Sequence, residues 1–343
     1  MSSVLQQITA NTQSSRKILL SILLYVLMLV GCGQENATET TVWDMPTPFV
    51  ESVFHTQNIQ LFAREIKQLT HGTLSIRIHA GASLYKHADI KQVVRSQQVP
   101  IGEILSSILS NENPIYQLDT LPFLATNYKQ AQALWQASQA EIRSLLEKEG
   151  LILLFAVPWP PQGLYTKRKI RKIEDLKGLK VRSYNPILSR LIELAGGIPT
   201  TVQSPEIPQA FSTGMIEAMI TSPSTGVSSQ SWDYITFYYD IQAWIPKNMV
   251  FVNKEMFKAL PDKTRTALWT AAEHAEKRGW EMSQQETVEK TGILAKKGVI
   301  VLKPCENLQS GLNKIGEKMA TEWQIKAGEP GKRILENFEK LTD

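Results

Sequence analysis

The sequence predicts a mixed α/β fold made of two domains that the chain crosses between. Stretches with apolar residues at helical spacing alternate along the chain with short runs of period two or of continuous apolar residues, which are typical of strands. The 343 residues are enough for two medium-sized domains. A proline-rich cluster at residues 158–161 cannot continue a helix or a strand, so we interpret it as the first crossing between the domains.

The first 31 residues are predicted to be a lipoprotein signal peptide that is not part of the fold. Arg16 and Lys17 precede an apolar run at 18–30 that is too short to span a bilayer as a helix. A small residue then precedes Cys32, which resembles a bacterial lipobox. The resemblance implies cleavage before Cys32, lipidation of its sulfur and membrane anchoring. A plain secretory signal or a short membrane anchor is the alternative, and residues 32–41 are expected to form a polar tether.

Composition excludes several classes of function. Hydrophobic residues make up 43% of the chain and charged residues 20%, as in an ordinary globular protein. The formal net charge of +4 falls to +2 without the leader's Arg16 and Lys17, which is too small to indicate a nucleic-acid partner. The cysteines are Cys32 and Cys305, so lipidation of Cys32 would leave no disulfide.

The first half of the chain is expected to build most of the first domain. The run at 54–69 has apolar residues at helical spacing and is followed by Gly72, which suits a helix stop. Residues 74–78 alternate apolar and polar, as in a half-buried strand. The predicted elements are strands at 42–45, 74–78 and 151–157, helices at 54–69, 88–96 and 128–148, and a strand or helix at 101–109.

The second half continues the alternation of strands and helices. We predict strands at 180–184, 200–203, 218–220, 248–253 and 299–302, and helices at 172–178, 186–195, 205–213, 262–297 and 312–341. The pattern at 262–297 has few breaks and no heptad repeat, so this helix could bridge both domains. The expected division is 42–160 with 248–285 in domain I, and 161–247 with 286–343 in domain II.

Arg182 is the centre of the predicted functional site. It ends a short predicted strand and is followed by Tyr184 and Asn185 before a new helix. A guanidinium offers a planar fork of donors that fits a carboxylate with two parallel hydrogen bonds. The alternative is a surface arginine on a strand edge, since most arginines are solvated.

Other side chains around Arg182 suit a small anion-binding cleft, which needs a few polar groups in apolar surroundings. The neutral hydrogen-bonding candidates are Gln162, Tyr184, Asn185, Thr221, Ser222 and Asn248. The flat apolar candidates are Trp159, Tyr238, Tyr239 and Trp244. Core packing is the alternative for the aromatic residues, and turn or cap chemistry is the alternative for Gln162, Asn185 and Asn248.

The sequence contains none of the common catalytic, phosphate-binding or metal-binding motifs. Its five histidines lack a metal-binding spacing, and it has neither a glycine-rich phosphate loop nor a Gly-x-Ser-x-Gly elbow. We therefore predict a binding protein with no cofactor and no metal rather than an enzyme. An envelope enzyme with an α/β cleft and an adaptor lipoprotein that binds protein remain alternatives.

Four short motifs follow one another after the leader. The most specific is Asp175-Leu176-Lys177-Gly178-Leu179-Lys180-Val181-Arg182, and the others are Gly72-Thr73-Leu74, Leu121-Pro122-Phe123 and Ala210-Phe211-Ser212-Thr213-Gly214. In this order they resemble the DctP-type receptors of TRAP (tripartite ATP-independent periplasmic) transporters. The resemblance covers nearly everything after the leader. It implies a two-domain periplasmic solute-binding-protein fold with a cleft between the domains and a long domain-spanning helix.

The same resemblance implies a function. The family's carboxylate-binding arginine falls on Arg182, and the receptor would deliver a carboxylated solute to a pair of membrane permease subunits. The expected location is the periplasm, with a lipid anchor on Cys32, or the cell surface where there is no outer membrane.

The chain departs from the family pattern at one ligand-binding position. Many members read Gly-x-x-Asp-Gly-x-Glu-Asn where this chain runs from Gly214 to Thr221, so Thr221 replaces the asparagine that often helps to bind ligand. The departure argues against a sialic acid or a simple dicarboxylate. With one well-placed arginine and several aromatic residues, we expect a monocarboxylate with an apolar or aromatic body. A C4-dicarboxylate is the alternative.

Overall fold

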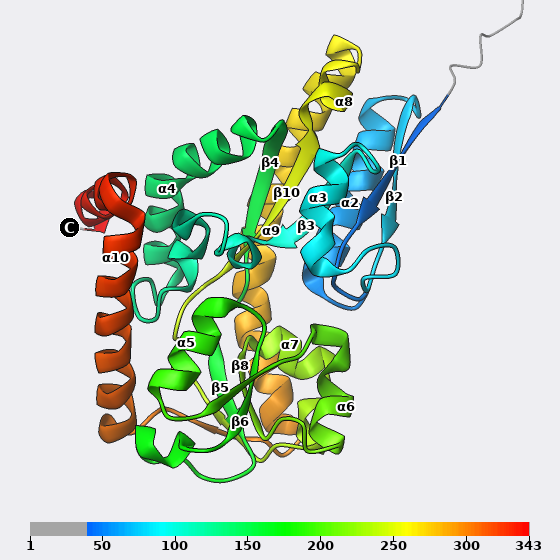
Figure 1. The fold of residues 1–343 in the computed structure, drawn as a ribbon. Helices are drawn as coiled ribbons and strands as arrows, with labels where there is room; N and C mark the ends of the chain where they lie inside the picture. The colour runs from blue at the N-terminus through cyan, green and yellow to red at the C-terminus, as the bar shows by residue number, and fades with distance from the viewer. Residues whose placement is uncertain (1–39, 343) are drawn as a thin grey trace, which may run out of the picture. The chain divides into compact units, whose positions relative to one another are not determined.

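The computed structural model describes residues 40–342, which form strands in three sheets with helices packed against them (Figure 1). The predicted signal peptide, Cys32 and most of the predicted tether lie outside the described residues. Among residues 40–342, no helix combines the length and the apolar composition needed to cross a membrane. The fold is the predicted mixed α/β fold.

The first half of the fold contains two small sheets, built from the N-terminal part of the chain and one later strand, β10. Their strands are β1 (Thr41–Pro46), β2 (Leu74–His79), β3 (Ile101–Leu105), β4 (Leu151–Pro158) and β10 (Lys247–Asn253). β1 and β2 pair in parallel, whereas β10 lies between β3 and β4 and is antiparallel to both. Every residue of β10 is buried, so this returning strand is a central strand of the three-stranded sheet.

Helices cover these two sheets. They are α2 (Phe54–Leu69), α3 (Ile90–Arg95), α4 (Tyr128–Lys148) and the short α8 (Lys254–Lys258), with 3₁₀ turns at His87–Asp89, Ser106–Leu109 and Pro114–Thr120. α2 has the predicted bounds. α4 also has the predicted bounds, and the Asn127 side chain fixes its start by accepting a hydrogen bond from Gln130 N. The stretch 101–109, predicted as strand or helix, is a strand followed by a 3₁₀ turn.

The second half forms a six-stranded sheet in the order β11-β9-β5-β8-β6-β7. Its strands are β5 (Gly163–Thr166), β6 (Lys180–Ser183), β7 (Ile198–Thr201), β8 (Ala218–Thr221), β9 (Phe237–Tyr239) and β11 (Ile300–Leu302). β6 is parallel to both β7 and β8, while β5 is antiparallel to β8 and β9. β5 and β9 were not predicted from the sequence, because three or four residues are too few to show a periodicity.

One predicted strand of this sheet is misplaced. The sequence predicted it at 200–203, but β7 runs from Ile198 to Thr201. The pairing with β6 sets these bounds: Ile198 N donates to Leu179 O, and Ile198 lies opposite Lys180 in the parallel register. Such a long-range pairing leaves no local signal in the sequence.

The helices of this half are α5 (Pro186–Leu194), α6 (Ile207–Ser212) and α7 (Pro223–Ser228), with 3₁₀ turns at Ile173–Leu176, Ser204–Glu206 and Ser231–Asp233. α5 and α6 lie within the predicted helices, whereas α7 was not predicted. α7 follows β8 directly, and Ser222 caps it by accepting a hydrogen bond from Thr225 N.

The predicted bridging helix is present as α9 (Asp262–Lys296), with 35 residues. It packs against α2 and β4 near its start and against α7 and β11 towards its end, so it contacts elements of both halves (Figure 1). Gly279 lets α9 approach β4 closely, because a Cβ there would lie 2.4 Å from Val157 Cγ2. Gly279, a residue type that disfavours helices, is thus a site of close packing.

The C-terminal helix α10 (Glu306–Thr342) begins six residues before the predicted start at 312. Leu308 and Leu312 pack in the core beside the six-stranded sheet, whereas Trp323 and Phe338 pack with α4 and the three-stranded sheet. The helical conformation is broken at Gly328, which has a φ of 56°. The predicted domain boundaries stay a prediction, and α10 contributes to the cores beside both sheets.

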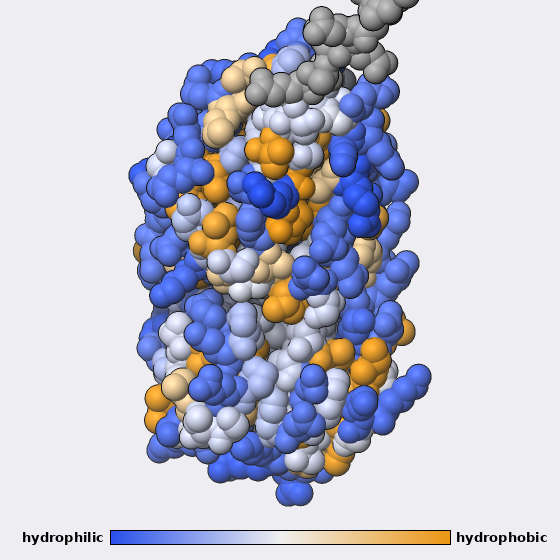
Figure 2. All heavy atoms as spheres, turned by 90° about the vertical axis from the view of Figure 1, so that its right-hand side faces the viewer, coloured by the Kyte–Doolittle hydropathy of each residue, from blue (hydrophilic) through white to orange (hydrophobic). Residues whose placement is uncertain are grey.

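Hydrophilic residues cover most of the face shown in Figure 2, and hydrophobic residues form separate patches on it. Most of the large apolar residues are gathered in the buried clusters beside the sheets.

Candidate functional site

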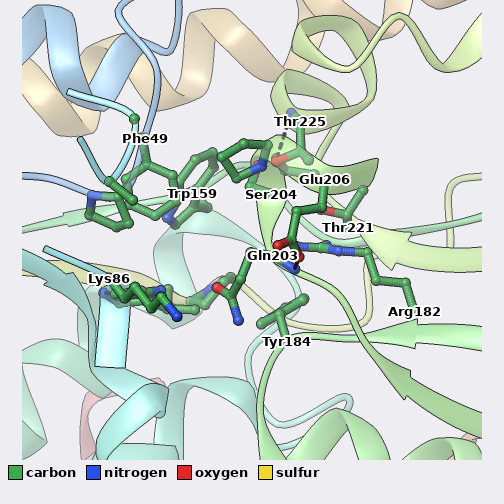
Figure 3. Close-up of a pocket in the computed structure, with 18 of the residues that line it drawn as sticks. Phe49, Lys86, Trp159, Arg182, Tyr184, Gln203, Ser204, Glu206, Thr221 and Thr225 are labelled. Carbon is green, nitrogen blue, oxygen red and sulfur yellow. Dashed lines mark hydrogen bonds between the residues drawn. The ribbon is translucent and has the colours of Figure 1, made fainter. Parts of the chain in front are cut away.

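A cavity of about 500 Å³ is lined by residues from both halves of the fold (Figure 3). The first half contributes Pro48, Phe49, Gly81, Ala82, Lys86, His87, Ala88, Leu105 and Trp159. The second half contributes Gln162, Arg182, Tyr184, Gln203, Ser204, Pro205, Glu206, Thr221, Ser222, Thr225 and Pro246. The lining includes residues at the ends of β6 and β8 and residues in the segments that follow β2, β4 and β7.

Arg182 is a buried cation in this lining. It lies on β6 between two paired strands, and only 4% of the residue is exposed. Its Nε donates to Val202 O at 3.0 Å, which fixes the plane of the guanidinium. Among the described residues, no carboxylate forms an ion pair with Arg182, and the two terminal nitrogens have no hydrogen-bond acceptor. Figure 3 shows the side chain reaching towards the middle of the lining residues.

The charge of Arg182 survives its burial. Burial lowers the pKa of the guanidinium to about 10, so it stays protonated at neutral pH. A buried charge without a partner is costly, and a cavity with an unpaired guanidinium therefore favours an anion. The flat fork of two free terminal nitrogens matches a carboxylate.

A short polar chain supports the floor of the cavity next to Arg182. Trp244 Nε1 donates to Tyr184 Oη at 3.3 Å, and Tyr184 Oη donates to Gln162 Oε1 at 3.4 Å. Gln162 Nε2 in turn donates to Pro160 O at 2.8 Å. Burial raises the pKa of Tyr184, so the phenol remains neutral. The chain orients the Tyr184 ring and the Gln162 amide, both of which line the cavity.

Hydroxyl groups from β8 and α7 form another part of the lining. Thr221 is the last residue of β8, and Ser222 begins the turn into α7. Ser222 Oγ accepts from Thr225 N at 3.1 Å and lies 3.2 Å from Thr225 Oγ1. These three residues add neutral hydrogen-bonding groups without adding charge.

The wall contributed by the first half is aromatic. The Trp159 and Phe49 rings meet edge to face with their centroids 4.9 Å apart, and His87 packs against Phe49. His87 Nε2 accepts a hydrogen bond from Leu105 N at 3.0 Å, which assigns the ring proton to Nδ1. Burial lowers the pKa of His87 to about 4, so the ring is neutral. This wall offers flat apolar surface and little charge.

Five of the nine predicted binding residues line the cavity: Gln162, Arg182, Tyr184, Thr221 and Ser222. The other four do not. Asn185 caps α5 and donates to Ser107 Oγ, so it takes the cap alternative. Tyr239 and Trp244 pack in the core beside the six-stranded sheet, and Asn248 lies behind Trp159 and accepts its indole N–H. Of the four aromatic residues proposed as flat apolar surface (Trp159, Tyr238, Tyr239 and Trp244), Trp159 lines the cavity and the other three do not.

Several lining residues were missed from the sequence. Phe49, Ala82 and His87 lie in segments that follow a predicted strand or precede a predicted helix, and Gln203 is the last residue of the strand predicted at 200–203. The rule that ligands bind beyond the ends of strands would have pointed to these loops. Glu206 also lines the cavity; it directly precedes α6, and its side chain accepts a hydrogen bond from Gln203 N at 2.9 Å. Within residues 40–342, no cluster of His, Cys, Asp and Glu could hold a metal ion.

Comparison with known proteins gives a consistent match. The family model described as "Bacterial extracellular solute-binding protein, family 7" matches residues 50–325. Two solved structures share 42% and 34% sequence identity with the chain, each with a TM-score of 0.86 and covering 88% of it. The first is DctP6 of Bordetella pertussis, an extracytoplasmic solute receptor binding pyroglutamic acid, matched over its full length. The second is a TRAP solute binding protein from a marine metagenome, specific for pyroglutamate and matched over 99% of its length.

A more distant relative has a different stated ligand. The C4-dicarboxylate-binding periplasmic protein DctP of Rhodobacter capsulatus is 22% identical over 60% of this chain and 63% of its own length.

Proposed function

Since the chain belongs to the bacterial extracellular solute-binding protein family 7, we propose that it is a receptor for pyroglutamate, or for a monocarboxylate of similar size, and delivers this solute to a TRAP permease. The family consists of solute-binding proteins rather than enzymes, and its members act outside the cytoplasm. The ligand is proposed for this chain from its cavity and from the stated ligands of its relatives.

The unpaired guanidinium of Arg182 is the observation that carries this proposal. A carboxylate that binds there would satisfy a cation that forms no ion pair among the described residues, although the carboxylate of Glu206 in the same lining acts on it at longer range. One buried arginine suits one carboxylate. Lys86 also lines the cavity, but it is exposed and has less to gain from a second carboxylate, and His87 is neutral.

The remaining lining suits the body of pyroglutamate. Its five-membered lactam ring is flat and carries one N–H donor and one C=O acceptor. The Trp159 and Phe49 rings supply flat surface, and Gln162, Thr221 and Ser222 supply neutral groups that can both donate and accept. A C4-dicarboxylate remains the alternative ligand, and it would leave its second carboxylate near this mostly neutral lining.

Calorimetric titration of the purified protein with pyroglutamate, proline, glutamate and succinate tests the ligand. We expect tight binding of pyroglutamate and loss of this binding in Arg182→Ala. Arg171→Ala, which removes an exposed arginine near the same sheet, is the matched control and should bind like the wild type. Wild-type affinity in Arg182→Ala, or tighter binding of succinate than of pyroglutamate, would contradict the proposal.

We also propose that Cys32 is lipidated and anchors the receptor to a membrane. The lipobox resemblance of residues 29–32 supports this. Expression in cells fed a radiolabelled fatty acid tests it, because Cys32→Ser should abolish labelling and release the protein from the membrane fraction. Equal labelling of both forms would refute the anchor.

Closure around the ligand is proposed to occur between the predicted domains, 42–160 with 248–285 and 161–247 with 286–343. The contribution of both halves of the fold to one cavity supports this. Small-angle scattering should show a smaller radius of gyration on addition of saturating pyroglutamate. An unchanged radius despite binding would speak against closure.

A further inference from the structure

A continuous buried hydrogen-bond chain, here called the Glu103 chain, lies behind the aromatic wall of the cavity. Phe49 N donates to Thr47 Oγ1 at 3.3 Å, and Thr47 Oγ1 donates to Glu103 Oε2 at 2.6 Å. On the other side, Asn248 Nδ2 donates to Glu103 Oε1 at 3.0 Å, and Trp159 Nε1 donates to Asn248 Oδ1 at 2.8 Å. All five residues are buried. The two ends of the chain, Phe49 and Trp159, line the cavity, whereas Glu103 itself does not.

The order of donors and acceptors along this chain is fixed at both ends. An indole nitrogen only donates, so Asn248 must present its oxygen to Trp159 and its amide hydrogens to Glu103. A backbone N–H also only donates, so the Thr47 hydroxyl accepts from Phe49 and gives its own hydrogen to Glu103. Both oxygens of Glu103 therefore accept, and the ionised carboxylate is the form that accepts well at both of them.

We propose that Glu103 is a positioning residue of the binding cavity, because its carboxylate fixes the Trp159 ring through Asn248 and the Phe49 backbone through Thr47. The chain joins β1, β3 and β10 to the end of β4, so one side chain sets the relative placement of four segments around the aromatic wall. The inference rests on the proposed function in one respect, namely that this cavity binds the solute. It adds a residue that acts without touching the ligand.

One titratable side chain, His55 of α2, faces Glu103 directly. Its Nδ1 lies 3.6 Å from Glu103 Oε1, and its ring centroid lies 4.3 Å from that of Trp159 with the ring planes tilted by 42°. Burial lowers the pKa of His55 well below its usual range, so the ring is neutral. Burial raises the pKa of Glu103 to about 7, against the opposing effect of its hydrogen bonds to Thr47 and Asn248. Protonation of Glu103 near neutral pH would therefore turn one of its oxygens into a weak acceptor and loosen the hydrogen-bond chain.

An exchange of two side chains tests the proposal. In Glu103→Gln, one oxygen becomes an NH₂ group, so two donors face each other at Asn248 or at Thr47. In Asn248→Asp, two carboxylates face each other. The double variant Glu103→Gln/Asn248→Asp restores every donor–acceptor pair and the single negative charge, because residue 103 then donates to residue 248 and still accepts from Thr47. Glu255→Gln, on the surface of α8, is the matched control.

The first readout needs no ligand. The protein has eight tryptophans, and the indole N–H resonance of Trp159 can be assigned by its absence in Trp159→Phe. We expect this resonance to shift in Glu103→Gln and to return towards its wild-type position in the double variant. An unmoved resonance in Glu103→Gln would overturn the proposal even if the cavity binds a different solute.

The second readout is affinity for pyroglutamate by calorimetry at pH 8. Glu103→Gln should bind at least tenfold more weakly than the wild type, and the double variant should recover to within about threefold. Lowering the pH from 8 to 6 should weaken the wild type but not Glu103→Gln. Thr47→Val removes one donor to Glu103 with little change of shape and should show a smaller loss of affinity. This variant replaces Glu103→Gln in the test if Glu103→Gln does not fold.

The outcomes separate the two proposals. Absence of pyroglutamate binding by the wild type would count against the proposed ligand, and the indole spectra would then decide the role of Glu103. Wild-type affinity in Glu103→Gln, or a folded double variant that binds no better than the single variants, would overturn the role of Glu103.

Discussion

The guanidinium of Arg182 lies over the ring of Tyr184, with Cζ 5.2 Å from the ring centroid. The ring face contributes a favourable cation–π contact without neutralising the charge. Nε is occupied by Val202 O, so the ring and the carbonyl together orient the guanidinium while leaving its terminal nitrogens for a ligand. This arrangement holds the binding group in place before the ligand arrives, which lowers the ordering cost of binding.

Arg182→Lys should weaken pyroglutamate binding almost as much as Arg182→Ala. Lysine keeps the charge, but it cannot donate to Val202 O and present a planar fork at the same time. We expect losses of roughly 10²-fold for lysine and 10²–10³-fold for alanine, as for a broken buried pair of about 3–5 kcal/mol. Parallel calorimetric titrations measure both. A lysine variant that binds as tightly as the wild type would show that charge alone is sufficient.

The raised pKa of Glu103 predicts that stability falls as pH rises. The folded state holds its proton up to about pH 7, whereas an unfolded glutamate loses it near its ordinary value. Folding therefore takes up a proton between these pH values, and raising the pH through this range destabilises the fold by up to about 3 kcal/mol. Urea unfolding at pH 5 and pH 8 should show this difference, and Glu103→Gln should largely remove it. If the free energy of unfolding of Glu103→Gln depends on pH as strongly as that of the wild type, other titratable groups cause the effect.

Asp119→Asn should strongly destabilise the fold. Lys247 is buried at the start of β10, and its Nζ lies 3.6 Å from Asp119 Oδ2. The same oxygen accepts from Lys247 N at 2.9 Å. Asparagine would remove the ion-paired carboxylate from the buried lysine and leave it only the more distant Glu276, at a cost of up to about 3–5 kcal/mol. Chemical denaturation measures the change in the free energy of unfolding. Glu147→Gln, which removes the ion pair between Glu147 and Lys254 at the surface, is the control and should change this free energy little. Equal small effects of the two variants would contradict this role of the buried pair.

Two glycine substitutions in α9 should have opposite effects. Gly279→Ala would place a Cβ 2.4 Å from Val157 Cγ2 and 2.8 Å from Asn58 Nδ2, so β4 or α2 would have to shift. Gly292 has no neighbouring atom within 4 Å of such a Cβ. Gly292→Ala should therefore stabilise the protein by up to about 1 kcal/mol through helix propensity, whereas Gly279→Ala should destabilise it. The thermal unfolding midpoints of the two variants test this prediction. A higher midpoint in both variants would contradict the close packing of Gly279 against Val157 and Asn58.

The regular elements were predictable where the local pattern is long. α2, α4 and α9 were predicted within about one residue of their observed ends, because several turns of helix repeat the same apolar spacing. The short strands β5 and β9 were missed, since their positions come from pairing with distant strands.

The sequence by itself determined the family motif, the placement of Arg182 at the end of a strand, and the run of elements. These depend on residues that are close together along the chain. Only the tertiary structure decided that Trp159 lines the cavity while Trp244 supports Tyr184 from the core. It also decided that Asn248 lies behind the wall, because β10 is inserted between β3 and β4. Which face of a crossing segment meets the cavity depends on long-range strand pairing, and local sequence spacing carries no record of that pairing.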